Sequence, residues 1–339
     1  MSGYHAGGIP AGPVAKPEFA NMREAVAAAL VSLAEREPKL IVVCPDSVKA
    51  MRMTGFAARF PERIFDVGIA EQQAVSFAVG LASCGFKPIV MTYAGFLSMR
   101  ACEQLRTFVG YTGLDVKFVG ANGGISAGER EGVTHQFFED LSIVRGIPGF
   151  RVLAPCDPWQ AGLALASLFE APGPAYLRVA GSKDARVLPE GSGFVPEKAR
   201  VHAEYGRRTA IFACGSILGR ALRAAAELND EGFGVMVVEV HTLKPLDSAG
   251  IAGILESTGS AVTLEDHTII GGLGSALAEA SVSLFPVPIE RVGLRDVFPE
   301  SGEGEALLDK YGMSVADIKT AARAVAARAV AARANTVRK

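Results

Sequence analysis

Residues 66–80, DVGIAEQQAVSFAVG, place one carboxylate, Glu71, in an almost uncharged run at the expected start of a helix. A carboxylate in a first helical turn is ordinarily a solvated side chain that the helix dipole favours. A glutamate buried beside an apolar surface can instead hold or share a proton near neutral pH, because desolvation raises its pKa. Taken alone, Glu71 fits the solvated alternative better, so the choice depends on the rest of the sequence.

The elements around Glu71 follow a regular order. Short β-rich apolar runs alternate with Ala-rich segments from residue 18 to about residue 180, which predicts a mainly parallel sheet covered by helices on both faces. We expect this first domain to span residues 18–185. The predicted strands are 40–44, 88–93, 116–121, 150–155 and 175–180, and the predicted helices are 21–36, 70–84, 97–111 and 157–170.

A second, smaller domain is expected at residues 207–325, after a linker at 186–206 that is rich in Gly, Pro and charge. The fold class is therefore α/β, with two three-layer domains, each a mainly parallel sheet flanked by helices. The second set of predicted strands is 209–214, 234–240, 260–266 and 288–293.

The two ends of the chain are expected to lie outside these domains. Residues 1–17 are dense in Gly and Pro, which predicts a flexible N-terminal tail. At 326–339 Ala-Arg recurs at a five-residue step that does not match the helical period, which predicts the fraying end of a helix.

Composition excludes several classes of protein. The 339 residues carry a formal net charge of -2 and no basic block interleaved with aromatics, so nucleic acid is not an expected partner. No apolar run reaches 18 residues and no signal-like start is present, so neither export nor membrane insertion is expected. The five cysteines form no CxxC pair, which indicates buried, reduced thiols in a cytoplasmic protein.

Common catalytic motifs are missing. The sequence has no GxxxxGK[ST] phosphate loop and no GxSxG elbow, and its five histidines show no metal-ligand spacing, so we predict no metal site within this chain. Gly-rich turns at 214–222 and 269–280 do not complete GxGxxG, and close strand–helix packing explains them better than a nucleotide site.

A longer constellation carries more information. Residues 60–96, FPERIFDVGIAEQQAVSFAVGLASCGFKPIVMTYAGF, are followed by RACEQLR, GISAGEREGVTHQFFEDLSIVRGIPG and VLAPCDP. Together they resemble the pyrimidine-binding domain of transketolase-like thiamine diphosphate enzymes, and EDHTIIGGLGSALAE at 265–279 resembles the C-terminal domain of the same family. The family's diphosphate-binding domain, with its GDG and a later Asn at a magnesium site, has no counterpart here.

The resemblance therefore implies the C-terminal subunit of a split transketolase. A separate N-terminal subunit would carry the diphosphate pocket and Mg²⁺, and the two chains would form an α2β2 heterotetramer. The implied activity is transfer of a two-carbon ketol unit from a ketose to an aldose, with thiamine diphosphate as cofactor and small sugars or sugar phosphates as substrates. Such a transferase would be active only with its partner subunit.

The resemblance also assigns roles to residues. Glu71 would be the acid that hydrogen-bonds pyrimidine N1′, and His135 in VTHQ would reach the substrate's oxygens. Tyr93 and Phe96 could instead be plain core, His135 a structural histidine, and Arg178 an exposed strand-end arginine. The implied cofactor-binding residues are Glu71, Ile69, Tyr93, Phe96 and Gln104, and the implied substrate-binding residues are His135, Arg178, Glu131 and Asn122.

Some positions depart from the family pattern. Asn122 stands where the family has a phosphate-binding histidine, Glu131 replaces a sugar-reading aspartate, and Gln73 stands where close relatives often have His. Asparagine cannot carry positive charge, so anion binding at position 122 is expected to be weaker. An unphosphorylated, sulfonated or otherwise unusual ketose is consistent with this change.

Two other readings stay open. One is the β subunit of a 2-oxo acid dehydrogenase or decarboxylase, which shares this architecture, although THQ and GISAGE favour transketolase. The other is a non-catalytic binding or regulatory subunit with the same fold, against which the intact Glu71 and His135 argue.

Overall fold

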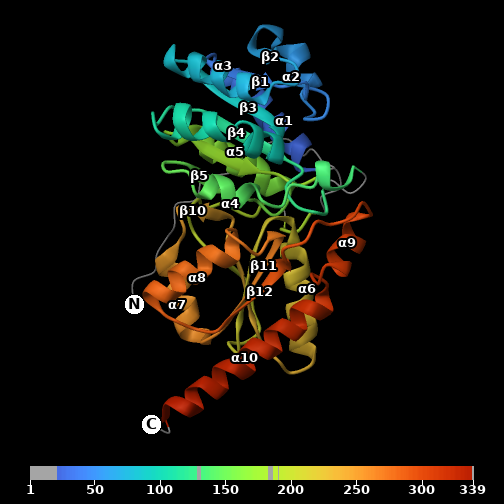
Figure 1. Cartoon of the computed structure of the whole chain (residues 1–339), viewed down its shortest axis with the longest axis vertical. Coiled ribbons are helices and arrows are strands. Elements are labelled where there is room, and N and C mark those ends of the chain that lie inside the picture. The colour runs from blue at the N-terminus through green and yellow to red at the C-terminus, as the bar shows by residue number, and fades with distance from the viewer. Residues whose placement is uncertain (1–20, 128–130, 182–185, 190, 338–339) are drawn as a thin grey trace.

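The chain forms two α/β units arranged along its long axis (Figure 1). The computed structural model describes residues 21–127, 131–181, 186–189 and 191–337, so the tail expected at 1–17 lies outside the described residues. Within those residues, no helix combines the length and the apolar character that crossing a membrane requires.

The first unit is built on a seven-stranded sheet. All its neighbouring strands pair in parallel except β10, which runs antiparallel to β5 although it comes from the second half of the chain. In spatial order the strands are β10 (Thr242–Lys244), β5 (Arg151–Leu153), β6 (Ala175–Arg178), β4 (Lys117–Ala121), β3 (Lys87–Tyr93), β1 (Leu40–Cys44) and β2 (Ile64–Asp66).

Helices cover both faces of this sheet because its strands are apolar on both sides. In β1, Val42 packs in the core beneath α1 (Met22–Arg36) and α5 (Pro158–Glu170), whereas Val43 packs in the core on the opposite face. The elements on that second face are α3 (Glu71–Ser83), the π-helical turns η2 (Phe96–Arg100) and η3 (Gln104–Gly110), and α4 (Asp140–Arg145). The short helix α2 (Thr54–Arg59) precedes β2.

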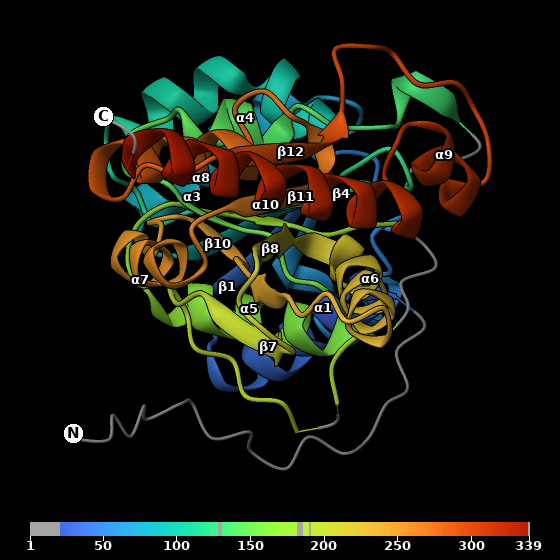
Figure 2. The same cartoon turned by 90° about the horizontal axis from the view of Figure 1, so that it is seen from below.

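The second unit repeats this plan on five strands. Their order is β12 (Ile289–Leu294), β11 (Ala261–Thr268), β8 (Ala210–Cys214), β9 (Met236–Glu239) and β7 (Arg200–Glu204), with only β7 antiparallel. The helices are α6 (Leu218–Asp230), α7 (Ser248–Thr258), α8 (Leu273–Leu284), α9 (Gly304–Lys310) and α10 (Val315–Val337). Figure 2 shows α10 crossing β11 and β12 on the same face as α6.

The predicted two-domain α/β class is confirmed, with local differences. The segment expected as a linker contains β7, and the helix expected at 97–111 is two π-helical turns separated by a break. The tail expected to fray from residue 326 remains helical through Val337. The thiol expectation is wrong for Cys84, which is exposed, and incomplete for Cys102, which is half-buried.

The Gly-rich turn before α8 is filled by the chain's own carboxylate. Glu265 accepts hydrogen bonds from the backbone N–H groups of Leu273 at 2.7 Å and Gly274 at 2.8 Å. Burial raises the pKa of Glu265 to about 7, against the opposing effect of these two donors. A side chain at Gly272 would lie 2.0 Å from the same carboxylate, so the turn serves strand–helix packing, as predicted.

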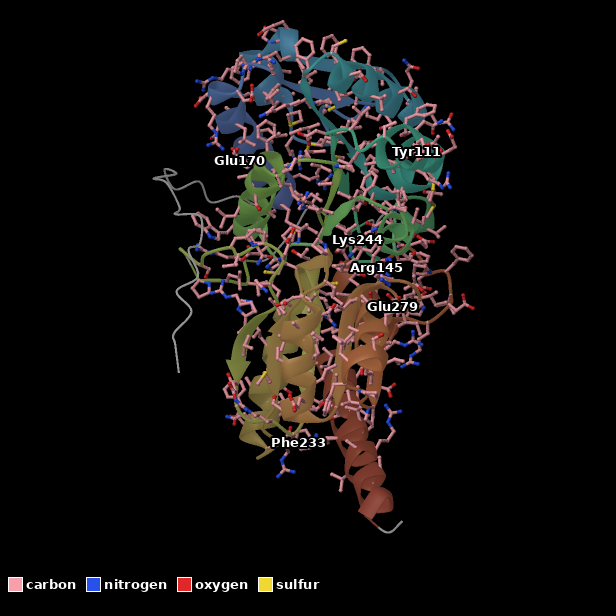
Figure 3. The ribbon with its side chains drawn as sticks, turned by 90° about the vertical axis from the view of Figure 1, so that its left-hand side faces the viewer. Tyr111, Arg145, Glu170, Phe233, Lys244 and Glu279 are labelled. Carbon is pink, nitrogen blue, oxygen red and sulfur yellow. The ribbon has the colours of Figure 1, made fainter. Side chains whose placement is uncertain are left out.

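Polar contacts join the two units at the surface of their junction. Arg145 on α4 donates to both carboxylate oxygens of Glu279 on α8, at 2.9 and 2.6 Å. Lys244 on β10 donates to the carbonyl oxygen of Arg145 at 3.0 Å. Figure 3 shows these three side chains grouped where the units meet.

A buried charge network lies deeper in the junction. Arg178, at the end of β6, is 5% exposed, and its Nε lies 3.2 Å from Oδ1 of Asp140, which is fully buried. The Tyr176 hydroxyl donates to the other Asp140 oxygen at 2.7 Å. Burial alone would lower the pKa of Arg178, but the carboxylates of Asp140 and Asp266 raise it overall.

Removing one partner from this network should be costly. We expect Asp140→Ala to lower the free energy of unfolding by about 3–5 kcal/mol, because it leaves the Arg178 guanidinium buried and uncompensated. Urea denaturation followed by circular dichroism measures the change. Glu170→Ala is the control, since its ion pair with Arg36 is about 60% exposed on both sides and should contribute less than about 1 kcal/mol. Equal unfolding midpoints for the two variants would contradict the prediction.

Candidate active site

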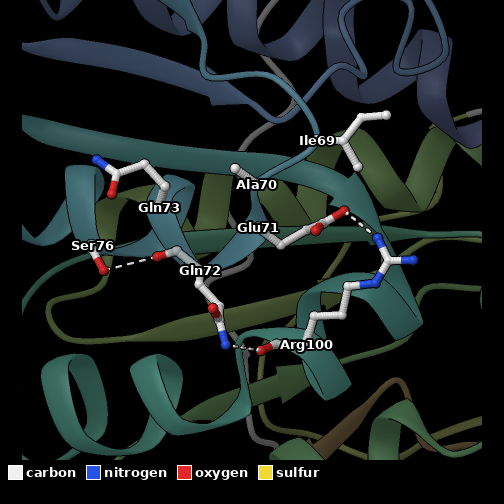
Figure 4. Close-up of a pocket in the computed structure, with 7 residues that line it drawn as sticks. All are labelled: Ile69, Ala70, Glu71, Gln72, Gln73, Ser76 and Arg100. Carbon is white, nitrogen blue, oxygen red and sulfur yellow. Dashed lines mark hydrogen bonds and ion pairs between the residues drawn. The ribbon is translucent and has the colours of Figure 1, made fainter.

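Glu71 is the first residue of α3, and its carboxylate is buried. Its side chain is 5% exposed, and Oε1 lies 3.1 Å from Nη1 of Arg100 at the end of η2. The two side chains meet in this ion pair, and both line a cavity of about 560 Å³ (Figure 4). The residues that line this cavity are Ile69, Ala70, Glu71, Gln72, Gln73, Ser76 and Arg100.

Arg100 connects the carboxylate to an aromatic ring. Its guanidinium carbon lies 3.9 Å from the centroid of the Phe96 ring, within the range of a cation–π contact. The Arg100 backbone is held as well, because its carbonyl oxygen accepts a hydrogen bond from Nε2 of Gln72 at 3.1 Å. Glu71, Arg100 and Phe96 therefore form one continuous group.

Four rings lie together beyond Phe96. Tyr93 from the end of β3, Phe96, His135 and Phe137 have centroid separations of 5.1 to 6.4 Å. The His135 centroid is 5.2 Å from that of Phe96. Four residues predicted from sequence, Glu71, Tyr93, Phe96 and His135, are thus joined by contacts that pass through Arg100.

The hydrogen bonds of His135 limit its tautomer. Its Nδ1 lies 3.0 Å from the Thr134 hydroxyl oxygen, and that hydroxyl donates to the carbonyl oxygen of Glu131 at 3.4 Å. When the Thr134 proton points to Glu131, Nδ1 must be the protonated nitrogen. Nε2 of a neutral His135 is then an acceptor.

The other predicted site residues lie around this group without a contact to Glu71. Ile69 lines the same cavity and is 75% exposed, and Gln104, the first residue of η3, has a buried Oε1 without a hydrogen-bond partner. Asn122 is buried in a left-handed conformation with φ of 58°, and its Oδ1 also lacks a partner. Glu131 is exposed at the turn before His135.

Arg178 has neither of the two environments considered from the sequence. It is buried rather than exposed, and its Nη2 and Nε atoms contact groups inside the protein. Besides the Asp140 pair, Nη2 donates to the carbonyl oxygens of Phe137 at 3.2 Å and Asp266 at 2.8 Å. This position favours a structural role over anion binding.

The segment that carries His135 is held by the second unit. Oδ1 of Asp266, on β11, accepts from the N–H of Ile125 at 2.8 Å, and Oδ2 accepts from the Ser126 hydroxyl at 2.5 Å. The N–H of Thr268 donates to the carbonyl oxygen of Phe138 at 2.8 Å. Contacts from β11 therefore fix the backbone on both sides of His135.

Sequence reasoning missed Arg100, Phe137 and Asp266. Arg100 and Phe137 lie within RACEQLR and THQFF, the same stretches that carry the resemblance. Glu71 and Arg100 are 29 positions apart, so no local periodicity predicts their contact. Among the described residues, no group of three or more His, Cys, Asp or Glu side chains is arranged to hold a metal ion.

Known proteins share this architecture. Residues 19–183 match the family described as transketolase, pyrimidine binding domain, and residues 197–318 match transketolase, C-terminal domain. The two-unit fold and the glutamate–aromatic site thus define a pair of transketolase domains. The chain belongs to the transketolase family, as the resemblance predicted.

Individual relatives cover the chain to different extents. A 6-deoxy-6-sulfo-D-fructose transketolase subunit, SqwH, from Clostridium sp. (strain MSTE9) is 38% identical, over 90% of this chain and 94% of its own length. A solved split gene transketolase, described as an inactive beta4 tetramer, has a TM-score of 0.84 at 36% identity and covers 91% of this chain and 99% of its own. A 1-deoxy-D-xylulose-5-phosphate synthase from Bordetella pertussis is 37% identical, but only 47% of its length is covered.

Packing around the aromatic group leads to a stability prediction. A Cβ at Gly95 would lie 1.9 Å from Cδ1 of Phe137, so Gly95→Ala should displace that ring and lower the free energy of unfolding by about 1–3 kcal/mol. Gly80, inside α3, has nothing within 4 Å of a built Cβ, so Gly80→Ala should stabilise the chain by about 0.5–1 kcal/mol. Thermal unfolding of both variants measures the two shifts, and a Gly95→Ala protein as stable as wild type would refute the packing argument.

Proposed function

We propose that this chain is the C-terminal subunit of a thiamine diphosphate-dependent transketolase, which acts with a separate N-terminal subunit to move a two-carbon ketol unit from a ketose to an aldose. The extent of the similarity supports a separate subunit. Split subunits match this chain over nearly their whole length, whereas the synthase match covers less than half of that enzyme. We assign Mg²⁺ and the diphosphate contacts to the partner, in an α2β2 assembly.

The observation that carries the proposal is the buried Glu71 carboxylate at a cavity beside an aromatic ring. A carboxyl group with little access to water, linked through Arg100 to the Phe96 ring, suits the polar edge and flat face of an aminopyrimidine. When bound, thiamine diphosphate supplies the electron sink for breaking and forming carbon–carbon bonds. In the proposed site, Glu71 would hold the pyrimidine N1′ and share a proton with it, and Phe96 and Tyr93 would orient the ring.

His135 has the properties of a proton shuttle in this proposal. When the Thr134 hydroxyl donates to Glu131, Nε2 of His135 is the acceptor, and in that tautomer His135 can take a proton from a substrate hydroxyl and return it. The aromatic neighbours at 5.2 to 6.3 Å hold the imidazole in position. Ile69, Gln104, Asn122 and Glu131 stay as proposed lining residues. Arg178 is reassigned to positioning because it is buried and its Nη2 donates to two backbone carbonyl oxygens inside the protein.

The first test is reconstitution. We expect the isolated chain to show no transketolase activity, and the chain with its N-terminal partner to transfer the unit from a ketose donor rather than from a 2-oxo acid. Glu71→Gln should lower kcat/KM of the pair by about 100-fold or more, since the amide cannot exchange the proton. Glu62→Gln, whose carboxylate is 71% exposed, is the control. Full activity in Glu71→Gln would favour a non-catalytic subunit, and preference for a 2-oxo acid would favour the dehydrogenase alternative.

The second test concerns the far end of the substrate. Asn122 cannot carry positive charge, and the relative named for a sulfonated ketose shows that family members act on acids other than phosphates. We expect Asn122→His to raise the ratio of kcat/KM for a phosphorylated ketose over its unphosphorylated counterpart by about tenfold, and Asn122→Asp to lower it. Sulfonated, phosphorylated and neutral donors should be compared in the same coupled assay. Ratios that stay constant in both variants would remove Asn122 from the substrate site.

A further inference from the structure

The pocket contains a cation that the proposed chemistry leaves unassigned. Arg100 makes two side-chain contacts there, one with Oε1 of Glu71 at 3.1 Å and one with the ring of Phe96 at 3.9 Å. Figure 4 shows its side chain extending from η2 to the Glu71 carboxylate. Its side chain is 48% exposed, in contrast to 5% for Glu71.

Both contacts involve groups that the proposed function gives to the cofactor. A carboxylate buried to this extent is costly without a partner, and Arg100 supplies one. The flat guanidinium also lies against the Phe96 ring, which is itself only partly buried. Arg100 thus makes a polar contact with Glu71 and a flat contact with the Phe96 ring. A pyrimidine ring could make the same two contacts with its polar edge and its flat face.

We propose that Arg100 is a placeholder for the cofactor's pyrimidine ring: it occupies the site in the empty subunit and must leave when thiamine diphosphate binds. This inference rests on the proposed function, because it takes Glu71 and Phe96 as the cofactor's contacts. Only the fraction of molecules in which the Arg100 side chain has moved away from Glu71 can bind thiamine diphosphate. The apparent dissociation constant is raised by the reciprocal of that fraction.

The local backbone suits such a movement. Arg100 ends η2, a π-helical turn, and π-helical turns are rare and frequently lie at functional sites. The next residue, Ala101, departs from helical geometry with φ of -101° and ψ of 20°. The Gln72 contact holds the Arg100 carbonyl oxygen rather than its guanidinium, so the side chain can rotate while the main chain stays anchored.

The test compares two arginines with the same pair of contacts. Arg100→Met removes the charge at nearly constant length. The matched control is Arg59→Met, because Arg59 forms an ion pair with Glu35 at 2.6 Å and lies 5.7 Å from the Phe60 ring, on α2 and away from the cavity. Both variants are assembled with the N-terminal subunit, and assembly is checked by size-exclusion chromatography with light scattering.

The main measurement is titration calorimetry with thiamine diphosphate and Mg²⁺ on the assembled pairs. We expect Arg100→Met to bind the cofactor about tenfold more tightly than wild type, equivalent to about 1.4 kcal/mol, and Arg59→Met to bind as wild type does. Weaker binding by Arg100→Met would mean that the arginine grips the cofactor, and unchanged binding would mean that it does not compete. Either result overturns the inference.

A second readout is independent of turnover and binding. Without cofactor, Arg100→Met should lower the thermal unfolding midpoint of the isolated chain, because the Glu71 carboxylate loses its partner; Arg59→Met should leave the midpoint nearly unchanged. Glu71→Gln combined with Arg100→Met should recover the loss, since a neutral amide needs no cation. An unchanged midpoint in Arg100→Met would show that the contact stabilises nothing and would count against a placeholder.

Failure of the proposed function gives a different pattern. If the wild-type pair binds no thiamine diphosphate, the proposed function fails and this inference fails with it. If the wild-type pair binds the cofactor and loses binding in Glu71→Gln, while Arg100→Met is not tighter, only the placeholder is wrong. A crystal structure of the loaded pair decides directly, since Arg100 should be more than 4 Å from Glu71.

Discussion

The buried charges between the two sheets are the constraint on which the rest of the molecule depends. Arg178 and Asp140 form an ion pair in the first unit, and Asp266 contributes a carbonyl oxygen and a carboxylate from the second. Charges buried to this degree need opposite charges and hydrogen-bond donors or acceptors nearby, because they have lost their contacts with water. The two units therefore cannot shift relative to each other without leaving a charge unsatisfied, and their junction behaves as a fixed part of the fold.

This constraint reaches the site through the backbone around His135. Asp266 holds Ile125 and Ser126, Arg178 holds the carbonyl oxygen of Phe137, and both residues lie outside the cavity. Gly124 is required here, because a side chain at that position, with φ of 107°, would lie 2.2 Å from the Asp266 carboxylate. The second unit thus contributes to the site by setting where the imidazole sits. It is a positioning element although none of its residues line the cavity.

The repeated strand–helix pattern made the architecture predictable. Val, Ile and Leu runs such as 40–44 are bounded by turn residues, and the matching strand ends at the same residues as predicted. Elements that depend on distant partners were not predictable. β7 has mostly exposed side chains in a segment rich in Gly, Pro and charge, so it lacks an apolar run. β10 has three residues and exists because β5 leaves an open edge for residues far along the chain. The helical continuation of α10 to residue 337 was missed because the five-residue Ala-Arg repeat drew attention away from the buried positions. Ile318, Ala322, Val325 and Ala329 are buried at helical spacing, and α10 packs against α6 and β11.

Predictability at the site followed the same division. Glu71, Phe96 and His135 each lie in a short motif that can be recognised in the sequence. The structure brings the three residues into one group through Arg100. The contacts of Arg100 with Glu71 and of Arg178 with Asp140 form only in the folded chain. The sequence shows a positive charge at both positions but not the carboxylate that each one contacts. Charged side chains are the hardest residues to assign in this way, because their role depends on the charge opposite them.

The composition of the cavity wall bears on why such a subunit would need a partner. Its apolar lining comes from Ile69, which is 75% exposed, and Ala70, while the remaining lining side chains are polar. Excluding water from a flat aromatic ring takes apolar surface on both sides, and a half-open wall cannot provide it. Met99, the residue before Arg100 in the chain, is also 45% exposed, so this part of η2 presents apolar area to solvent. In a one-chain relative the covering surface can come from elsewhere in the same polypeptide; in the proposed two-chain enzyme, closure of this wall and completion of the site are the same event.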